Sequence, residues 1–135
     1  MIAVFVDKEL DAAIYTIKGD VKYGEIRDEI DKYFKGAFTK YTVWDFSKSN
    51  PDKNMTADEI QQLGSYVSES AKGHQHRFDL IVVPNIEQYG DARMYQAYSE
   101  TTPKETRNSN SIVFREMEEA IEFIRNNEKS AKDIK

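Results

Sequence analysis

Residues 89–98 (YGDARMYQAY) hold the densest mixture of hydrogen-bond donors and aromatic side chains in the chain. Arg93 can bind a carboxylate or a phosphate through two parallel hydrogen bonds, and Tyr89 and Tyr95 can form the walls of a groove beside it. Tyrosine, methionine and arginine are also enriched at protein interfaces. The segment therefore predicts a ligand site or an interface. The alternative is that Met94, Ala97 and Tyr98 pack on the sheet while Arg93 pairs with a nearby acid.

A second candidate site lies at the end of the stretch YTVWDFS, where Asp45 and Ser47 follow aromatic and β-branched residues. Ligands of open parallel sheets bind beyond the carboxyl ends of the strands, so polar side chains at this position can form part of a site. Trp44 and Phe46, together with the tyrosines, can line an apolar pocket next to it. The alternative is that Asp45 and Ser47 bond to backbone amides of the following loop, as in Asx and ST turns.

Thr56 begins the pattern Thr-Ala-Asp-Glu, which matches a capping box. The threonine hydroxyl accepts a hydrogen bond from the N3 amide, and Glu59 accepts one from the amide of Thr56. A phosphate on Thr56 would meet the free amides of a helix N-terminus, but Asp58 and Glu59 would repel it. A cap is worth about 1 kcal/mol and explains the residue by itself. We therefore predict a cap, with phosphorylation as the alternative.

Motifs for metal binding and catalysis are missing from the sequence. His74 and His76 form a His-x-His pair, but a third zinc ligand would have to come from Asp45 or Asp79, without the usual spacing. The chain has no cysteine, which excludes disulfides, thiolate catalysis and a cysteine-zinc site. It also lacks a nucleophile elbow, a Walker loop and a dinucleotide-binding glycine motif. The sequence therefore predicts no enzyme, no cofactor and no metal.

Composition excludes several further classes. The net charge is −5 with both signs interspersed, so there is no basic stripe for a nucleic acid. No window approaches the roughly 20 apolar residues that span a bilayer. The apolar run at residues 2–6 has no basic segment before it and is too short for a signal peptide. We expect a cytoplasmic protein without a transmembrane segment, for which peripheral membrane contact stays open.

The apolar periodicity predicts one α/β domain at residues 1–127, with a charged tail at 128–135 that frays. A short connection between the first two strands indicates a hairpin, and the later alternation of strands and helices indicates parallel pairing with right-handed crossovers. The result is a mostly parallel five-stranded sheet with one antiparallel strand at its start and four helices, in the order ββαβαβαβα. The predicted strands are 2–6, 12–18, 41–46, 78–83 and 111–114; the predicted helices are 22–35, one that begins at Thr56 and ends at Gly73, 90–99, and one that begins near Met117.

Four stretches of the chain resemble the SpoIIAA-like proteins of the STAS group (sulphate transporter and anti-sigma-factor antagonist), in particular its small stand-alone bacterial members. They are IYTIKGDV, YTVWDFS, GDARMYQAYSE and IVFREMEEAIEFI, and with the element order they span essentially the whole chain. The resemblance implies an α/β fold without known catalytic activity, with roles in protein–protein regulation and in ligand or lipid recognition. The regulatory branch phosphorylates a serine in an Asp-Ser pair after the third strand, where this chain has Met55-Thr56.

Two functional hypotheses follow. The first is a non-enzymatic binding or regulatory module of STAS type, which acts through protein–protein contacts as a homo-oligomer. The second is a carrier or sensor of a small amphipathic ligand such as a lipid or a fatty acid, bound in a pocket lined by Trp44, Phe46 and the tyrosines. An enzyme is the least favoured class.

Overall fold

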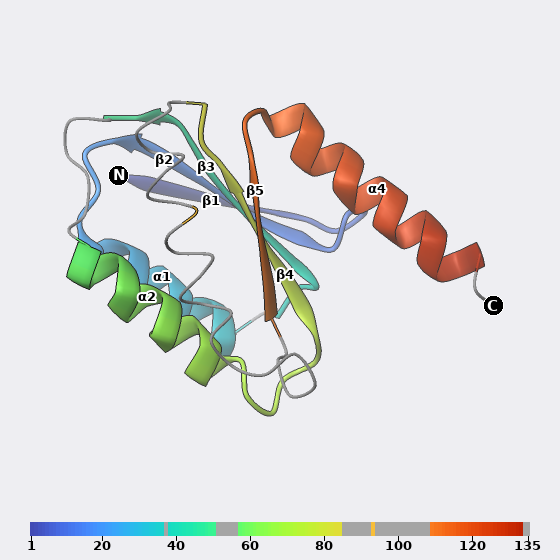
Figure 1. Cartoon of the computed structure of the whole chain (residues 1–135), viewed down its shortest axis with the longest axis horizontal. Coiled ribbons are helices and arrows are strands. Elements are labelled where there is room, and N and C mark those ends of the chain that lie inside the picture. The colour runs from blue at the N-terminus through green and yellow to red at the C-terminus, as the bar shows by residue number, and fades with distance from the viewer. Residues whose placement is uncertain (37, 51–56, 85–92, 94–108, 134–135) are drawn as a thin grey trace.

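The computed structural model describes residues 1–36, 38–50, 57–84, 93 and 109–133 (Figure 1). The described elements are an opening pair of strands followed by three further strands and three helices along the chain, which confirms the predicted α/β class. The predicted helix at residues 90–99 lies outside the described residues apart from Arg93, so three helices are described. The strands are β1 (Ile2–Asp7), β2 (Ala12–Gly19), β3 (Tyr41–Ser49), β4 (Arg77–Val82) and β5 (Ser109–Phe114), and the helices are α1 (Tyr23–Lys35), α2 (Ala57–Ser70) and α4 (Met117–Asp133).

The five strands form one sheet in the order β1-β2-β3-β4-β5, so neighbours in the sheet are also neighbours along the chain. β1 is antiparallel to β2, and the other three pairs are parallel. This confirms the predicted five-stranded, mostly parallel sheet with an antiparallel first strand. The strand order itself is a finding of the structure.

A short turn joins β1 to β2 and fixes the hairpin. The Asp7 carboxylate accepts hydrogen bonds from the amides of Glu9 (3.0 Å) and Leu10 (3.1 Å). Asp11 has a φ of 52°, in the left-handed region that aspartate adopts more readily than most residues. The hairpin therefore has an aspartate at each end, each in a position that suits its short polar side chain.

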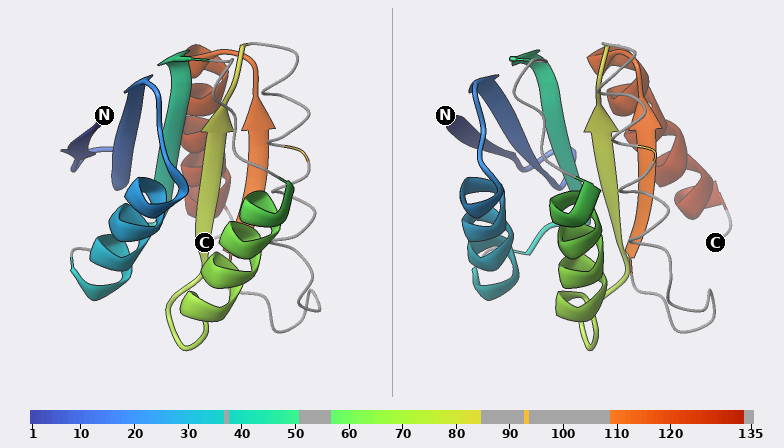
Figure 2. Two further views of the ribbon diagram at one scale, coloured as in Figure 1. Left: turned by 90° about the vertical axis from the view of Figure 1, so that its left-hand side faces the viewer. Right: turned by 60° about the vertical axis from the view of Figure 1, so that its left-hand side comes forward.

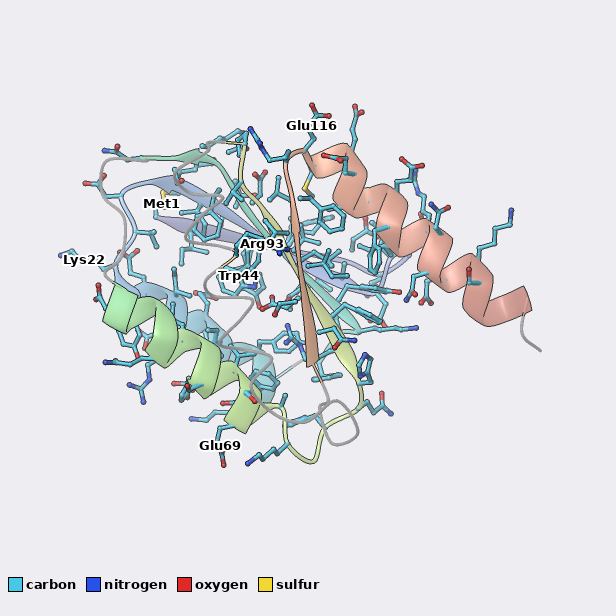
Figure 3. All side chains as sticks on the ribbon, in the orientation of Figure 1. Met1, Lys22, Trp44, Glu69, Arg93 and Glu116 are labelled. Atoms are coloured by element: carbon cyan, nitrogen blue, oxygen red, sulfur yellow. The ribbon has the colours of Figure 1, made fainter. Side chains whose placement is uncertain are left out.

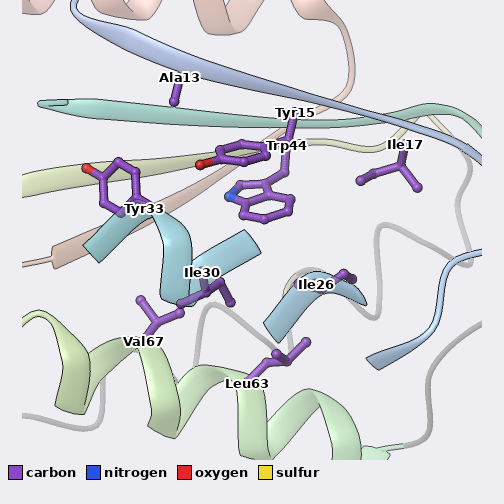
Figure 4. Packing of buried hydrophobic residues seen from close by; sticks show 9 residues of the cluster. All are labelled: Ala13, Tyr15, Ile17, Ile26, Ile30, Tyr33, Trp44, Leu63 and Val67. Atoms are coloured by element: carbon purple, nitrogen blue, oxygen red, sulfur yellow. The ribbon is translucent and has the colours of Figure 1, made fainter. Parts of the chain in front are cut away.

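Helices cover the two faces of the sheet unequally (Figure 2). α1 and α2 pack on one face, where Ile30 and Val67 join a buried cluster with Trp44 (Figure 4). α4 packs on the other face, over β3, β4 and β5, through Ala120 and Ile124. We call these the α1/α2 face and the α4 face. Each helix is apolar along one side only, and none of those described has the length and apolar character that crossing a membrane requires.

Helix α4 extends further than the sequence predicts. Residues 128–133, which the sequence predicts as part of a charged tail that frays, continue the helix. Side-chain contacts with the start of β3 hold this part of the helix: the Glu128 carboxylate accepts hydrogen bonds from Lys40 Nζ (2.6 Å) and the Tyr41 hydroxyl (2.7 Å). Asn127 in turn donates to the Tyr41 hydroxyl (2.7 Å). Residues 134–135 lie outside the described residues.

Candidate functional site

Asp45 and Ser47 do not stand at the end of the third strand as predicted, because β3 continues to Ser49 and contains both residues. The pairing of β2 with β3 contains a bulge here: Thr16 faces Asp45, but Lys18 faces Lys48, which leaves one extra residue in β3. The Asp45 carboxylate accepts a hydrogen bond from the Ser47 amide (2.9 Å) inside this bulge. The geometry thus favours the alternative interpretation of Asp45, in which its carboxylate satisfies a local backbone amide.

The described helices form no ligand crevice at the carboxyl ends of β2 and β3. In open α/β sheets a ligand crevice forms where the strand order reverses and the helices on either side go to opposite faces. Here the order does not reverse, and α1 and α2, which follow β2 and β3, lie on the same face (Figure 2). The two helical crossovers that the structure describes therefore build no such site.

Trp44 is part of the core. Its ring stacks on that of Tyr15, with centroids 4.1 Å apart and an interplanar angle of 8°, and only 7% of the residue is exposed (Figure 4). Phe46 is partly buried against the same cluster. Burial raises the pKa of the Tyr15 phenol well above its ordinary value, and the nearby Glu29 carboxylate raises it further. Tyr15 and Trp44 therefore belong to the hydrophobic core, and the Tyr15 hydroxyl stays neutral.

A small hollow lies beneath α1 and α2, beside Trp44. It measures about 220 Å³ including the space open to solvent, and its interior has room for roughly one water molecule. Small-molecule sites usually occupy about 300–1,000 Å³. As far as the described residues form it, the hollow is too small for a fatty acid. Its lining residues are Ile30, Tyr33, Phe34, Thr42, Trp44, Val67, Arg77 and Asp79.

Three of the sequence-predicted site residues, Thr56, Tyr89 and Tyr95, lie outside the described residues. The predicted cap, the alternative of phosphorylation and the predicted groove therefore stay predictions. Arg93 is described, and it is exposed (Figure 3).

The α1/α2 face carries buried polar side chains that the sequence analysis missed. Thr42 of β3 faces Asp79 of β4, which faces Ser111 of β5, so three polar residues form one row across the sheet. Arg77 precedes Asp79 by two residues and points to the same face. All four are at most 2% exposed. Tyr33 of α1 lies beside Arg77, and together with these four residues it forms what we call the buried polar cluster.

Arg77 is the centre of this cluster. Its guanidinium lies 3.6 Å from the Asp79 carboxylate. It also donates hydrogen bonds to the hydroxyls of Tyr33 (3.2 Å) and Thr42. The Thr42 hydroxyl donates to Asp79 (2.7 Å) and so bridges the two charges. The guanidinium also lies over the rings of Tyr33 and Phe34, 4.9 and 5.4 Å from their centroids.

The buried polar cluster is satisfied within the chain. Among the described residues, no buried side-chain nitrogen or oxygen lacks a hydrogen-bond partner. Burying a charge is costly unless it is paired and hydrogen-bonded, and here both conditions are met. The sequence RFDLIVV does contain the pattern that indicates such a pair. Arg77 and Asp79 alternate with apolar residues, which places opposite charges side by side on one face of a buried strand.

The two histidines of the His-x-His pair contact different aromatic rings. His74 stacks on Phe38, with centroids 5.3 Å apart. His76 meets the edge of Phe78 at 4.9 Å, and its Nε2 lies 3.3 Å from the side-chain nitrogen of Asn110. No group of three or more histidine, aspartate or glutamate residues in the described part of the chain is arranged to hold a metal ion.

β1 combines an edge position with exposed apolar side chains. Within the described ranges, every exposed large hydrophobic residue belongs to residues 1–6: Met1 is 67% exposed, Val4 48%, Phe5 62% and Val6 43%. β1 is one of the two edge strands, and among the described residues it pairs with β2 alone. Edge strands are usually protected by charges, proline or a bulge, and residues 2–6 contain neither a charge nor a proline.

The backbone of β1 alternates between bonds to β2 and groups directed outward. Met1 and Lys18 exchange two backbone hydrogen bonds (2.9 and 3.1 Å), which identifies them as a hydrogen-bonded pair. Such pairs alternate along an antiparallel ladder, so every second residue after Met1 also bonds to β2. The intervening residues Ile2, Val4 and Val6 therefore direct their N–H and C=O groups away from the sheet.

Comparison with known proteins does not assign a family. No protein-family model matches the chain, and a search of curated proteins finds no match. The STAS resemblance therefore stays a prediction from the sequence.

Proposed function

We propose that this protein is a non-enzymatic binding module of STAS type that acts through protein–protein contacts, with β1 as its contact strand. The observation that carries the proposal is the concentration of exposed apolar side chains on one edge strand. Val4, Phe5 and Val6 lie on this strand, and Val4 and Val6 also direct backbone groups outward.

The physical gain lies in pairing with an extended segment of another molecule. Main-chain hydrogen bonds along a sheet edge supply affinity, and the side chains on both faces of the strand supply additional buried area. An apolar side chain gains stabilisation in proportion to the area it removes from water, about 25 cal/mol per Å². Phe5, which is 62% exposed, gains little from folding and much from being covered.

The second hypothesis, a carrier or sensor of a lipid or fatty acid, has weaker support. The described residues beside Trp44 enclose a hollow of about 220 Å³, partly open to solvent, and the Trp44 ring itself is stacked in the core. Protein contact through β1 is therefore the function that we prefer.

Site-specific photo-crosslinking tests the proposal. Phe5 is replaced by p-benzoylphenylalanine, and the matched control carries the same group in place of Glu122, an exposed residue of α4. After irradiation in cells of the natural source, we expect protein adducts of discrete mass from position 5 and none from position 122. The additional change Val4→Pro removes one outward amide and should reduce the adducts, since proline has no N–H. No adduct from position 5 would contradict the proposal.

Native mass spectrometry of the purified protein tests the competing hypothesis. A small apolar molecule that co-purifies in a fixed ratio would favour the carrier. Protein without such an adduct, together with crosslinks at position 5, would favour the binding module.

A further inference from the structure

We propose that the partner of β1 is a second copy of this chain, bound by antiparallel pairing of the two β1 strands about a two-fold axis at Val4. This inference rests on the proposed function and names its partner. The pairing would join two five-stranded sheets into one continuous sheet of ten strands. Four independent properties of the β1 edge fit a second copy: backbone polarity, side-chain size, charge and free space.

The backbone of β1 is symmetric about Val4. In the proposed pairing Val4 faces Val4 of the second copy, and Ile2 faces Val6. These three residues are the ones that direct N–H and C=O outward, so each facing pair can exchange two hydrogen bonds, about six in all. A pairing shifted by two residues would either leave one of these outward residues unpaired or bring Asp7 opposite Ala3.

The side chains are also self-complementary in this register. On the α1/α2 face the facing residues Ile2, Val4 and Val6 are all β-branched, and such pairs stabilise neighbouring strands. On the α4 face Phe5 of each copy faces Ala3 of the other. A large ring therefore lies beside a small residue, and the two rings do not compete for the same space.

The charges around β1 favour a two-fold antiparallel arrangement. No charged side chain occurs in residues 2–6, so the strand does not repel its own copy. The turn at residues 7–11 (DKELD) carries three acids and one lysine, a net charge of −2. The opposite end of β1 adjoins residues 18–22 (KGDVK), with two lysines and one acid, a net charge of +1. Antiparallel pairing brings the acidic end of each copy beside the basic end of the other.

On the α4 face, helix placement leaves room for the second copy. α4 lies over β3, β4 and β5, and β1 extends beyond it (Figure 2). Six residues of strand on each side are fewer than the roughly 20–30 residues a side of a standard stable interface. We therefore expect a reversible dimer with a Kd on the order of micromolar, and not a permanent one.

Single cysteines test the pairing, because the chain has none of its own. In Val4→Cys the two sulfurs meet at the axis, where the Cα atoms are about 5.5 Å apart, within the range of a disulfide. We expect mild oxidation to give a dimer of twice the 15.7 kDa chain mass. The matched control Ile2→Cys places its sulfur on the same face of the strand. In the proposed dimer, however, the two introduced cysteines lie about 13 Å apart along the strands, so this variant should stay monomeric. The double variant Ile2→Cys with Val6→Cys should crosslink again.

Sedimentation of the cysteine-free protein provides the second measurement. We expect a concentration-dependent dimer that Val4→Pro weakens at least tenfold, while its circular dichroism spectrum stays unchanged. Equal crosslinking of Val4→Cys and Ile2→Cys would overturn the two-fold register. A dimer that Val4→Pro leaves intact would overturn β1 as the interface.

Failure of this inference can be told apart from failure of the proposed function. If position 5 crosslinks to a different protein and Val4→Cys stays monomeric, the contact function stands and self-pairing is wrong. If position 5 gives no adduct and the protein sediments as a monomer, both are wrong.

Discussion

The edge of the sheet and its interior both depart from the usual pattern of apolar residues inside and charged residues outside, and they do so in opposite ways. At β1 apolar side chains face water, whereas beneath α1 and α2 a guanidinium and a carboxylate are buried. In the interior the chain itself supplies the partners of these charges. Arg77 forms an ion pair with Asp79, and the Thr42 hydroxyl accepts a hydrogen bond from Arg77 and donates one to Asp79. For Val4, Phe5 and Val6 the described residues offer no comparable cover. The buried polar cluster therefore stabilises the fold, and for the edge we propose a contact with another molecule.

The largest effect should come from breaking the interior pair. Asp79→Ala leaves the Arg77 guanidinium buried without its carboxylate, and we expect the free energy of unfolding to fall by about 3–5 kcal/mol. Urea denaturation followed by circular dichroism measures this fall. The milder variant Asp79→Asn keeps the volume in case the alanine variant does not fold.

A double replacement is the control for this prediction. Arg77→Met with Asp79→Leu removes both charges, and it should recover most of the lost stability because neither desolvated charge remains. A loss below about 1 kcal/mol in Asp79→Ala would show that other groups neutralise Arg77, and the contrast between interior and edge would weaken.

The next effect concerns the bridge between the two charges. Thr42→Val removes the hydroxyl that donates to Asp79 and accepts from Arg77, so we expect a loss of about 1–3 kcal/mol. Thr16→Val, in β2 on the α4 face, is the matched control, and it should change stability by less than about 0.5 kcal/mol. Equal effects of the two substitutions in urea denaturation would contradict a bridging role for Thr42.

A smaller effect should appear in alkaline solution. Burial raises the pKa of the Tyr15 phenol above its value of about 10 in the unfolded chain. Above that pH the unfolded state releases the proton while the folded state keeps it, so this contribution to stability is complete below about pH 10 and declines as the pH rises further. Tyr15→Phe should therefore lose less stability between about pH 9 and pH 11 than the unmodified protein.

Denaturation at several alkaline pH values measures the difference between the two slopes. Tyr41→Phe should act in the same direction, because burial is also the main cause that raises the pKa of Tyr41. Identical slopes in all three proteins would contradict the burial argument.

The smallest effect on stability is expected at β1, and it tests most directly the difference between the edge of the sheet and its interior. Val6→Thr, at a residue that is 43% exposed, should change the free energy of unfolding by less than about 0.5 kcal/mol. The same substitution at Val43, which is fully buried in β3, should cost about 1–3 kcal/mol, since it buries a hydroxyl. A large loss in Val6→Thr would show that the fold already uses this side chain.

Elements with local apolar periodicity could be predicted from the sequence. Ile26, Ile30 and Tyr33 recur at helical spacing and are buried in α1 as that pattern requires. The Asp45 interaction was also within reach of the sequence, as the alternative interpretation, because its hydrogen bond spans only two residues. Patterns of this kind depend on neighbours that the chain itself places side by side.

Features that depend on distant segments could not be predicted in this way. Thr42 and Asp79 meet across 37 positions, and Lys40 and Glu128 across 88, which is why the polar cluster and the end of α4 were missed. The exposure of β1 was missed for a related reason. Its sequence IAVFV is apolar on both faces, a pattern typical of a strand covered on both sides, and only its position in the sheet places it in water.

The coincidence of strand order with chain order bears on how the protein folds during synthesis. Each new strand pairs with the strand made just before it, so the sheet can grow from the hairpin without waiting for a later segment of the chain. α4 follows the five strands along the chain, and until it is made no other described helix covers the apolar face with Tyr41, Val43 and Leu80. Chains that stop before Met117 should therefore aggregate, as incomplete folds with exposed apolar surface do. Solubility of the nascent sheet thus depends on the synthesis of α4.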